Sequence, residues 1–417
     1  MPSLQDKTVS PRPGPNINRK GFGLKQEVRG ALDRDYGSGL IGYFLQQEYE
    51  LRLGNLTLLL AQEFGFCYGV ERAIDYAYQT RRRFPDRRIF LIGPIVHNRF
   101  VNRQLEEMGI TILDGFQQDD MDFSFLQPED VVVFPAFGVK QHTVERLKKT
   151  GCVLVDTTCG SVISVWKRVE KYAREGYTTL IHGKYHHEET QATCSHVGKY
   201  PGAKFLVVLN REETQLVCDV IRGAQPAKVL LERLGPHASP GFNPETDLQK
   251  IGVANQTTML SSESLEIARM LREALRKRYG ERELSKRFLS FDTICSATQD
   301  RQDAVVALVT RKKPDLMLVI GGFQSSNTGH LAEIAGRLVP TYHIEDAGCL
   351  ISRREIRFRE PLTGRLRSAK DWLPGGPVRI GLTAGASTPN VKIAEVVWRL
   401  AELSGQQEVL HRLLEDR

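Results

Sequence analysis

LTLLLAQEFGFC, residues 56–67, begins as a short apolar run, ends on a cysteine and continues into the amphipathic stretch GVERAIDYAYQTRRRF. A short apolar run predicts a strand, and apolar residues spaced three or four apart predict a helix. The same order of strand, cysteine and helix recurs at CVLVDTTC, residues 152–159, and at FLSFDTIC, residues 288–295. The cysteines at these three junctions are Cys67, Cys159 and Cys295.

Each predicted helix is followed by two more predicted strands, such as IFLIGPIVHN (89–98) and VVVFPAFG (131–138) in the first unit. Strands that alternate with helices predict an α/β fold with parallel sheets, in which ligands bind beyond the carboxyl ends of the strands. We therefore predict three pseudo-repeated α/β units with small parallel sheets, arranged like a trefoil around one centre. The residues at these strand ends are His97, Phe137, His187, Glu189, Thr257, Thr258, Ser325, Ser326, Asn327 and Ser387.

The first residues are rich in proline and glycine and then become a short helical stretch at about residues 40–49, in which no chemistry is visible. We therefore treat them as an appended segment. The predicted divisions are an N-terminal extension (1–54), a first unit with Cys67 (55–158), a second with Cys159 (159–294), a third with Cys295 (295–400) and a C-terminal tail (401–417).

The composition restricts the class of protein. The chain has 417 residues, 41% of them hydrophobic, and a formal net charge of +7. No apolar run approaches the roughly 18 residues of a membrane span, and MPSLQDKTVSPRPGP at the start lacks the apolar core of a signal peptide. A modest positive charge suits an acidic ligand but falls short of a nucleic-acid-binding composition. We expect a cytoplasmic enzyme that binds neither nucleic acid nor membrane.

The seven cysteines are scattered and never form a CxxC pair, which argues against a disulfide framework and against zinc fingers. A cysteine at a helix N-terminus is expected to have a lowered pKa and so to serve as a thiolate ligand. Three distant thiolates could hold one zinc ion with a water, or an iron–sulfur cluster with one iron left open to substrate. The cysteines without this recurrence, expected to be ordinary buried thiols, are Cys152, Cys194, Cys218 and Cys349.

Several of these motifs together resemble a known family, the 4-hydroxy-3-methylbut-2-enyl diphosphate reductases (IspH, or LytB). The resemblance covers about residues 56–394, and RKGFG (19–23) and PAFG (135–138) are similar to its plant and cyanobacterial branch. The motifs, in chain order, are GFCYGVERA, VHN, DTTC, HHEETQAT, NQTTML, TICSATQDRQDA, SSN and TAGAST.

The resemblance implies reductive removal of the allylic hydroxyl of 4-hydroxy-3-methylbut-2-enyl diphosphate. The products are isopentenyl and dimethylallyl diphosphates, in the last step of the non-mevalonate (MEP) pathway. It also implies one [4Fe-4S] cluster per chain on Cys67, Cys159 and Cys295, with the open iron on the substrate hydroxyl. By the same resemblance Glu189 delivers the proton and Thr257 hydrogen-bonds the hydroxyl. Ferredoxin or flavodoxin would donate the electrons.

The diphosphate needs hydrogen-bond donors other than a P-loop, because GGFQSSNTGHL lacks the P-loop lysine. A helix predicted at about 330–338 would follow SSN and add its N-terminal N–H groups. The expected substrate-binding residues are His97, His187, Thr257, Thr258, Ser325, Ser326, Asn327 and Ser387.

One position departs from the family pattern. Many members have a second diphosphate-binding histidine where this chain has Phe137, which can neither donate a hydrogen bond nor carry charge. His142 lies five residues further on, and we expect it at a solvated helix position instead. At this position the predicted diphosphate site therefore has one donor fewer than in those members.

Two other functions stay open on the residues alone. A three-cysteine iron–sulfur hydro-lyase would remove water without net reduction and would need no electron donor. A non-catalytic cluster or zinc protein that binds RNA would need a basic groove with interleaved aromatic residues, which the arginine clusters here lack. For an acidic electron donor, the candidate landing surfaces are residues 81–88 and the basic segment 352–370.

Overall fold

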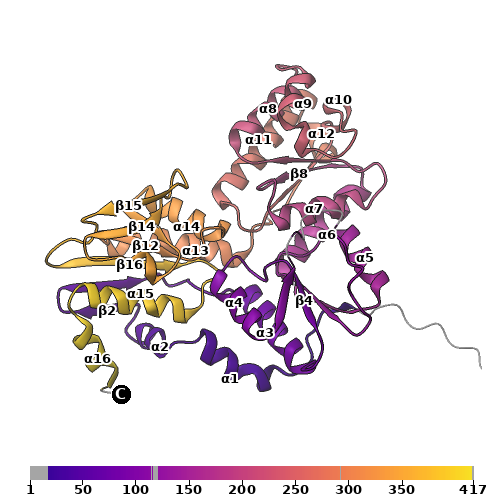
Figure 1. Cartoon of the computed structure of the whole chain (residues 1–417). Helices are drawn as coiled ribbons and strands as arrows, with labels where there is room; N and C mark the ends of the chain where they lie inside the picture. The colour runs from indigo at the N-terminus through magenta and orange to yellow at the C-terminus, as the bar shows by residue number, and fades with distance from the viewer. Residues whose placement is uncertain (1–16, 114, 116–120, 292, 416–417) are drawn as a thin grey trace, which may run out of the picture.

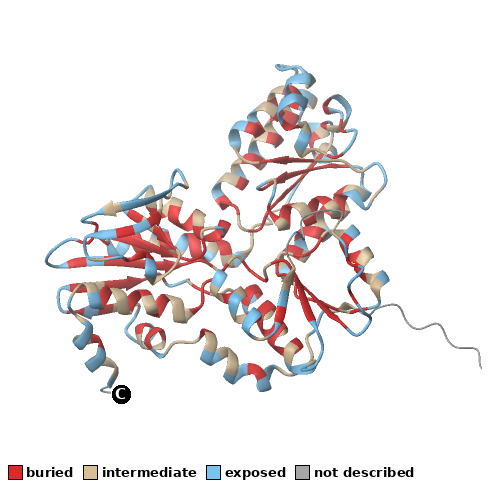
Figure 2. Ribbon diagram, viewed as in Figure 1, coloured by how far each residue is buried: buried red, intermediate tan, exposed pale blue. Residues whose placement is uncertain are grey.

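The computed structural model describes residues 17–113, 115, 121–291 and 293–415. Its three β-sheets are each covered by helices and form three lobes that meet near the middle of the molecule (Figure 1). The strands are largely buried, and the outer helical surfaces are exposed (Figure 2). The predicted α/β class with three small sheets is confirmed. Within the described residues, no helix is long and apolar enough to span a membrane.

The first sheet has five strands in the order β1-β7-β6-β4-β5, all paired in parallel. Parallel sheets are buried on both faces, so their strands are continuous apolar runs such as β6. The strands are β1 (Ile17–Asn18), β4 (Ile89–Ile92), β5 (Ile110–Leu113), β6 (Val131–Phe134) and β7 (Val153–Asp156), and the connecting helices are α4 (Arg99–Glu107) and α5 (Gln141–Thr150).

The second sheet is a parallel sheet of four strands in the order β11-β10-β8-β9. Its strands are β8 (Thr178–His182), β9 (Phe205–Val208), β10 (Ile251–Asn255) and β11 (Phe288–Ser290). Its helices are α7 (Glu188–Gly198), α8 (Arg211–Ile221), α9 (Ala227–Leu234), η1 (Gly235–His237), α10 (Pro244–Asp247), α11 (Ser261–Tyr279) and α12 (Glu281–Arg287).

The third sheet has seven strands in the order β15-β14-β13-β12-β16-β3-β2, with a parallel centre and antiparallel strands at both edges. Its strands are β2 (Glu50–Leu53), β3 (Leu56–Leu60), β12 (Leu316–Ile320), β13 (Thr341–Ile344), β14 (Glu355–Arg359), β15 (Leu366–Lys370) and β16 (Val378–Ala384). The remaining helices around it are α2 (Gly39–Gln46), η2 (Leu308–Lys312), α14 (Ser326–Gly336), η3 (Ala347–Cys349), α15 (Asn390–Leu403) and α16 (Gln407–Glu415). α1 (Lys25–Tyr36) instead contributes Val28 and Tyr36 to the core of the first sheet.

The helices that follow the three cysteines are α3 (Tyr68–Arg83), α6 (Gly160–Arg174) and α13 (Ser296–Ala307). Each is preceded by its cysteine as the N-cap residue, as the sequence predicts. The strand before each cysteine belongs to a different sheet from the strands that follow its helix: β3 lies in the third sheet, β7 in the first and β11 in the second. Each cysteine therefore lies where the chain passes from one lobe to the next.

Residues 17–54 are part of the fold and are not an appended segment, and residues 1–16 of the predicted extension lie outside the described residues. β2 pairs with β3, so the predicted division after residue 54 cuts through a β-hairpin whose closing pair is Leu53 and Leu56. Leu40, Ile41 and Phe44 of α2 share the core of the third sheet with these strands. β3 itself, grouped with the first unit in the sequence-based division, pairs in parallel with β16 of the third sheet.

Both chain ends contribute to this core. The helix expected at about 40–49 is α2, which begins after the Ser38 cap and ends before Glu48 and Tyr49, two residues with positive φ. Positive φ is costly for residues with a side chain and ends a helix. At the other end, Leu410 of α16 is fully buried in the same core, so the predicted C-terminal tail is also packed.

Candidate functional site

The three cysteines of the repeated pattern come together around one cavity. Cys67, Cys159 and Cys295 all line a cavity of about 90 Å³ between the lobes. Gly69 shows how closely two of the sulfurs approach, because a Cβ on it would lie 2.5 Å from Cys159 Sγ and 3.9 Å from Cys67 Sγ. Glycine leaves that space open. The three cysteines that the sequence predicted to converge therefore lie around one cavity in the structure.

The environment of the thiols favours metal ligation over free thiolate. Burial raises the pKa of Cys67 and raises that of Cys295 to about 11, so the expected lowering by the helix N-termini is wrong for these two. Without a bound cation these two groups are therefore neutral thiols at pH 7, and a metal bound to the sulfurs would favour the thiolates. Three converging sulfurs with no fourth protein thiol fit an iron–sulfur cluster with one open iron. The remaining cysteines, buried as expected, are Cys152, Cys194, Cys218 and Cys349.

Glu189 lies in the same cavity, at the first turn of α7, and only 2% of it is exposed. Thr257, in the turn after β10, donates to both carboxyl oxygens: its N–H to Oε1 at 2.6 Å and its hydroxyl to Oε2 at 2.9 Å. Burial raises the pKa of Glu189 to about 7, although the bonds from Thr257 oppose the rise. The carboxyl group is thus able to hold a proton near neutral pH.

Thr258 lines the cavity beside Thr257 and is held by Gln256, whose Nε2 donates to the Thr258 hydroxyl at 2.7 Å. The backbone N–H of Lys184 donates to Gln256 Oε1 at 3.0 Å. Gln256 therefore links the turn after β8 to the turn after β10 and positions Thr258 at the strand end.

The anion-binding residues predicted from SSN and TAGAST also converge. Ser325 caps α14, which begins at Ser326, earlier than the helix predicted at 330–338. Asn327 accepts the N–H of Ala386 through Oδ1 at 3.0 Å, and its Nδ2 is buried without a hydrogen-bond partner. Ser387 lies beside them and donates to the carbonyl of His97 at 3.3 Å. A buried unpaired amide donor beside two serine hydroxyls suits a phosphate group.

The two histidines and Phe137 form one aromatic cluster at the cavity wall. The rings of His97 and Phe137 are stacked with centroids 4.3 Å apart, and His187 packs edge-on against both. His187 caps α7 by accepting the Glu189 N–H through Nδ1 at 3.2 Å. Burial lowers its pKa to about 3, so its ring is neutral at pH 7. Phe137 thus supplies a stacking surface in the place of a donor.

Glu188 is a site residue that the sequence-based prediction missed. Its Oε2 lies 3.2 Å from His97 Nε2 and 3.7 Å from His187 Nδ1. Burial raises its pKa, but the hydrogen bond with His97 and the nearby charges of the two histidines together outweigh burial and lower the pKa to about 2. HHEE contains two adjacent acids, and only the start of α7 turns Glu188 toward His97 and Glu189 toward Thr257. The signal available in the sequence was that His187 can cap a helix, because the start of that helix sets the directions of the two acids that follow.

Other residues lie outside the cavity. His142 is exposed on α5, as expected.

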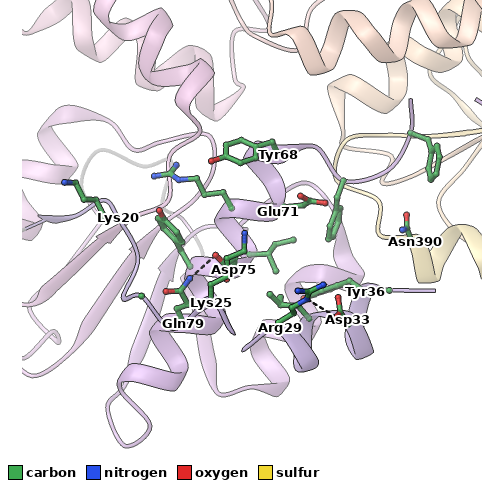
Figure 3. Close-up of a pocket in the computed structure, with 18 residues that line it drawn as sticks. Lys20, Lys25, Arg29, Asp33, Tyr36, Tyr68, Glu71, Asp75, Gln79 and Asn390 are labelled. Carbon is green, nitrogen blue, oxygen red and sulfur yellow. Dashed lines mark hydrogen bonds and ion pairs between the residues drawn. The ribbon is translucent and has the colours of Figure 1, made fainter. Parts of the chain in front are cut away.

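An outer cavity of about 800 Å³ adjoins the site and shares four residues with it. The shared residues are His97, His187, Ser325 and Ser326. A third cavity, of about 830 Å³, lies between α1 and α3 and contains Tyr68, Glu71 and Lys20 but none of the three cysteines (Figure 3).

Comparison with known sequences gives one family. A family model described as "LytB protein" matches residues 58–401. The 4-hydroxy-3-methylbut-2-enyl diphosphate reductase of Gloeobacter violaceus is 46% identical over 397 residues, which are 94% of each chain. The protein of the same name from a Synechococcus species is also 46% identical, over 93% of this chain and 95% of its own.

Two solved structures are similar in fold. The structure titled "(E)-4-Hydroxy-3-methyl-but-2-enyl Diphosphate Reductase, the Terminal Enzyme of the Non-Mevalonate Pathway" has 26% identity and a TM-score of 0.50, and covers 83% of this chain and 99% of its own. The E-1-hydroxy-2-methyl-but-2-enyl-4-diphosphate reductase from Plasmodium falciparum has 23% identity and a TM-score of 0.59, and covers 82% and 87% respectively.

Proposed function

The chain belongs to the LytB family, and from that premise we propose how its residues carry out the family reaction. It is an oxidoreductase that converts 4-hydroxy-3-methylbut-2-enyl diphosphate to isopentenyl and dimethylallyl diphosphates, in the last step of the non-mevalonate pathway. Hydroxide is a poor leaving group, so the site must supply a Lewis acid, a proton, two electrons and a grip on the diphosphate. The alternatives of a hydro-lyase or an RNA-binding protein are not favoured by these relatives.

The observation that carries the proposal is the convergence of Cys67, Cys159 and Cys295 on the cavity that also contains Glu189. These three thiols would hold one [4Fe-4S] cluster. Bound there, the cluster would supply the Lewis-acidic iron and pass electrons one at a time. The open space at Gly69 between two of the sulfurs supports this assignment.

Glu189 would be the proton source for the leaving hydroxyl. Its carboxyl group is protonated up to about pH 7, is buried, and is oriented by two hydrogen bonds from Thr257. The Thr257 hydroxyl is placed to contact both this carboxyl group and a substrate hydroxyl in the same cavity. A general acid with a pKa near the working pH is the efficient choice for such a step.

The diphosphate would be held at the opposite side of the cavity. Ser325, Ser326 and Asn327 at the start of α14 would donate with Ser387, and the unpaired Asn327 Nδ2 supports this role. His97 and His187 would complete the grip from the first and second lobes. In this chain Phe137 stacks on His97 and Glu188 lies 3.2 Å from His97 Nε2, so a braced His97 would serve without the further histidine that many family members have at the position of Phe137.

The electron donor would be a small acidic redox protein, ferredoxin or flavodoxin. The chain has no G-x-G-x-x-G motif after a strand for a nucleotide cofactor, so electrons must come from outside. The excess of seven positive charges supports an acidic partner. A cytoplasmic location stays a prediction from the sequence.

Anaerobic purification followed by iron, sulfide and zinc analysis tests the cluster. We expect about four irons and four sulfides per chain, and loss of both cluster and turnover when Cys67, Cys159 or Cys295 is replaced by serine. The matched control is Cys218→Ser, a buried cysteine outside the site. Stoichiometric zinc without iron would refute the cluster, and turnover without any reductant would identify a hydro-lyase.

A further inference from the structure

Arg301 is a buried cation that the proposed reaction does not use. It lies on α13, the helix that Cys295 begins, and only 3% of it is exposed. Its guanidinium donates to the carbonyls of Gly65 at 2.8 Å and Phe66 at 3.1 Å, directly before Cys67, and to that of Ala297 at 2.8 Å. Each of these acceptors is an uncharged backbone carbonyl. The Arg301 Nε atom has no hydrogen-bond partner.

A buried guanidinium without an anion is strongly unfavourable. Across the described ranges, 17–113, 115, 121–291 and 293–415, Arg301 makes no ion pair with a carboxylate. The guanidinium donates to the carbonyl of Phe66, the residue directly before Cys67. The Cys67 sulfur and its ligand are therefore the candidates for the counter-charge of Arg301.

The charge of the proposed cofactor matches this requirement. A [4Fe-4S]²⁺ core with three thiolate ligands carries one net negative charge, and one-electron reduction adds a second. A fixed cation beside the cluster therefore stabilises the oxidised form and stabilises the reduced form more. The positive charge of Arg301 beside Cys67 is compensated only when the negatively charged cluster is bound.

We propose that Arg301 is the internal counter-charge of the iron–sulfur cluster and also the brace that fixes the Cys67 loop against the Cys295 helix. The inference rests on the proposed function, because it needs the cluster. Arg301 touches no substrate in this scheme. It acts on the reaction through the potential and the position of the metal centre.

Two further arginines show that the bracing role is part of a cyclic pattern. Arg72 on α3, the Cys67 helix, donates to the carbonyl of Thr158, directly before Cys159, at 2.9 Å. Arg168 on α6, the Cys159 helix, lies 4.0 Å above the ring of Phe291, shortly before Cys295. With Arg301, each cysteine helix thus holds the loop before the next cysteine. Arg72 and Arg168 are half-buried, so only Arg301 combines the brace with a buried, uncompensated charge.

Two substitutions separate the two roles. Arg301→Gln keeps a donor for the carbonyls but removes the charge, whereas Arg301→Lys keeps the charge but loses the planar fork. We expect Arg301→Gln to lower the reduction potential of the cluster, measured electrochemically on anaerobic holoenzyme, and Arg301→Lys to leave it near that of the unaltered chain. Both should release iron to a chelator about 10- to 100-fold faster, the scale for lost outer-shell partners of a metal site.

Arg399→Gln is the matched control. Arg399 also braces a loop, by donating to the carbonyls of Leu350 and Ile351, but it is paired with Glu402 and lies outside the cysteine cavity. We expect it to change neither the potential nor the rate of iron release.

An unchanged potential in Arg301→Gln, at full iron content, would overturn the counter-charge role. If Arg301→Gln does not retain its cluster, Arg301→Lys decides: a potential near that of the unaltered chain supports the role, and a lowered potential overturns it. Iron release at the normal rate in both variants would overturn the bracing role. Absence of iron from the unaltered chain would instead refute the proposed function, so the two failures are distinguishable.

Discussion

Glu189 and Glu188 are neighbours whose pKa values move in opposite directions, and their surroundings explain the difference. Glu189 has only the Thr257 donors and is fully enclosed, so its pKa rises to about 7. Burial would raise the pKa of Glu188 as well, but Glu188 faces His97, and the hydrogen bond and charges there lower its pKa to about 2. The anion at Glu188 also contributes to the raised pKa of Glu189. One pair of acids thus supplies a proton donor and a permanent anion.

We predict that Glu189→Gln binds substrate but turns over at least ~10²-fold more slowly, the usual scale of general-acid catalysis. Glutamine keeps the shape of the side chain and the acceptor for Thr257 but has no proton to give. The measurement is kcat and KM with a chemical reductant under anaerobic conditions. Near-normal kcat would refute the role.

The pH dependence of the unaltered chain provides the control. Glu189 is neutral and able to donate below about pH 7 and is ionised above it, so kcat should fall as the pH rises through this value. In Glu189→Gln the residual rate should no longer show this decline. A decline of the same size in both proteins would assign it to another group.

Phe137 is the second residue with a direct test. Its ring stacks on His97 at the cavity wall, so an imidazole at this position is near enough to add a donor for the diphosphate. We predict that Phe137→His tightens substrate binding by about 1.5 to 3 kcal/mol, the range for a hydrogen bond to a charged group. Phe137→Leu, which adds no donor and removes the stack, should not tighten it. An unchanged or higher KM in Phe137→His would mean that packing closes the position or that another residue already holds the phosphate.

At the scale of elements, the sequence predicted the repeated order of strand, cysteine and helix. It could not predict which strands pair with one another in the sheets. Strand, cysteine and helix recur at Cys67, Cys159 and Cys295, and the structure has a helix starting directly after each. The apolar run of β3 fits any buried parallel strand, however, and its partner β16 lies more than three hundred residues later in the chain. Local pattern carries no information about that choice. Glu188 escaped prediction for a similar reason, since its direction depends on where α7 begins.

The N-terminal hairpin gives the element-scale prediction. Leu53 of β2 is fully buried in the core of the third sheet, although sequence composition alone indicated an appended segment. We predict that Leu53→Ala lowers the free energy of unfolding by about 2 to 5 kcal/mol, the cost of a large cavity in a core. Thermal unfolding of the purified protein measures this. Leu366→Ala, at an exposed leucine of β15, is the control and should change stability little. If Leu53→Ala changed the free energy of unfolding as little as Leu366→Ala does, the packing of β2 would be dispensable for stability.

At the scale of the molecule, the three lobes are linked in a ring. The strand before each cysteine belongs to one sheet and the helix after it leads into the next, so the cysteines lie at the junctions between lobes. Displacement of any lobe would therefore move two cysteines relative to the third. The cyclic contacts of Arg72, Arg168 and Arg301 oppose such displacement. A threefold repeat is visible in sequence, but this exchange of strands between lobes is not.

The position relative to Cys67 distinguishes two candidate surfaces for the electron donor. The basic segment 352–370 forms the β14–β15 hairpin, and three strands (β13, β12 and β16) lie between β14 and β3, which leads to Cys67. Tyr68, by contrast, directly follows Cys67 and is 80% exposed. Lys20 and Lys25 line the cavity beside it, and neither has an ion-pair partner in the part of the chain that the structure describes (Figure 3). Because electron transfer slows steeply with distance, we expect an acidic donor to bind around Tyr68 and not at the hairpin.

We predict that the double variant Lys20→Glu, Lys25→Glu slows reduction by an acidic ferredoxin at least about tenfold at low salt, because steering between opposite charges is lost. Turnover with a small chemical reductant should be unchanged, since neither lysine lies in the catalytic cavity. The comparison variant reverses Arg353, Arg354 and Arg357, which are exposed on and beside β14. If that variant slows the ferredoxin reaction and the lysine variant does not, the donor binds the hairpin surface, and electrons must then reach the cysteines across the third sheet. Equal loss with both reductants in either variant would indicate damage to the fold and not to docking.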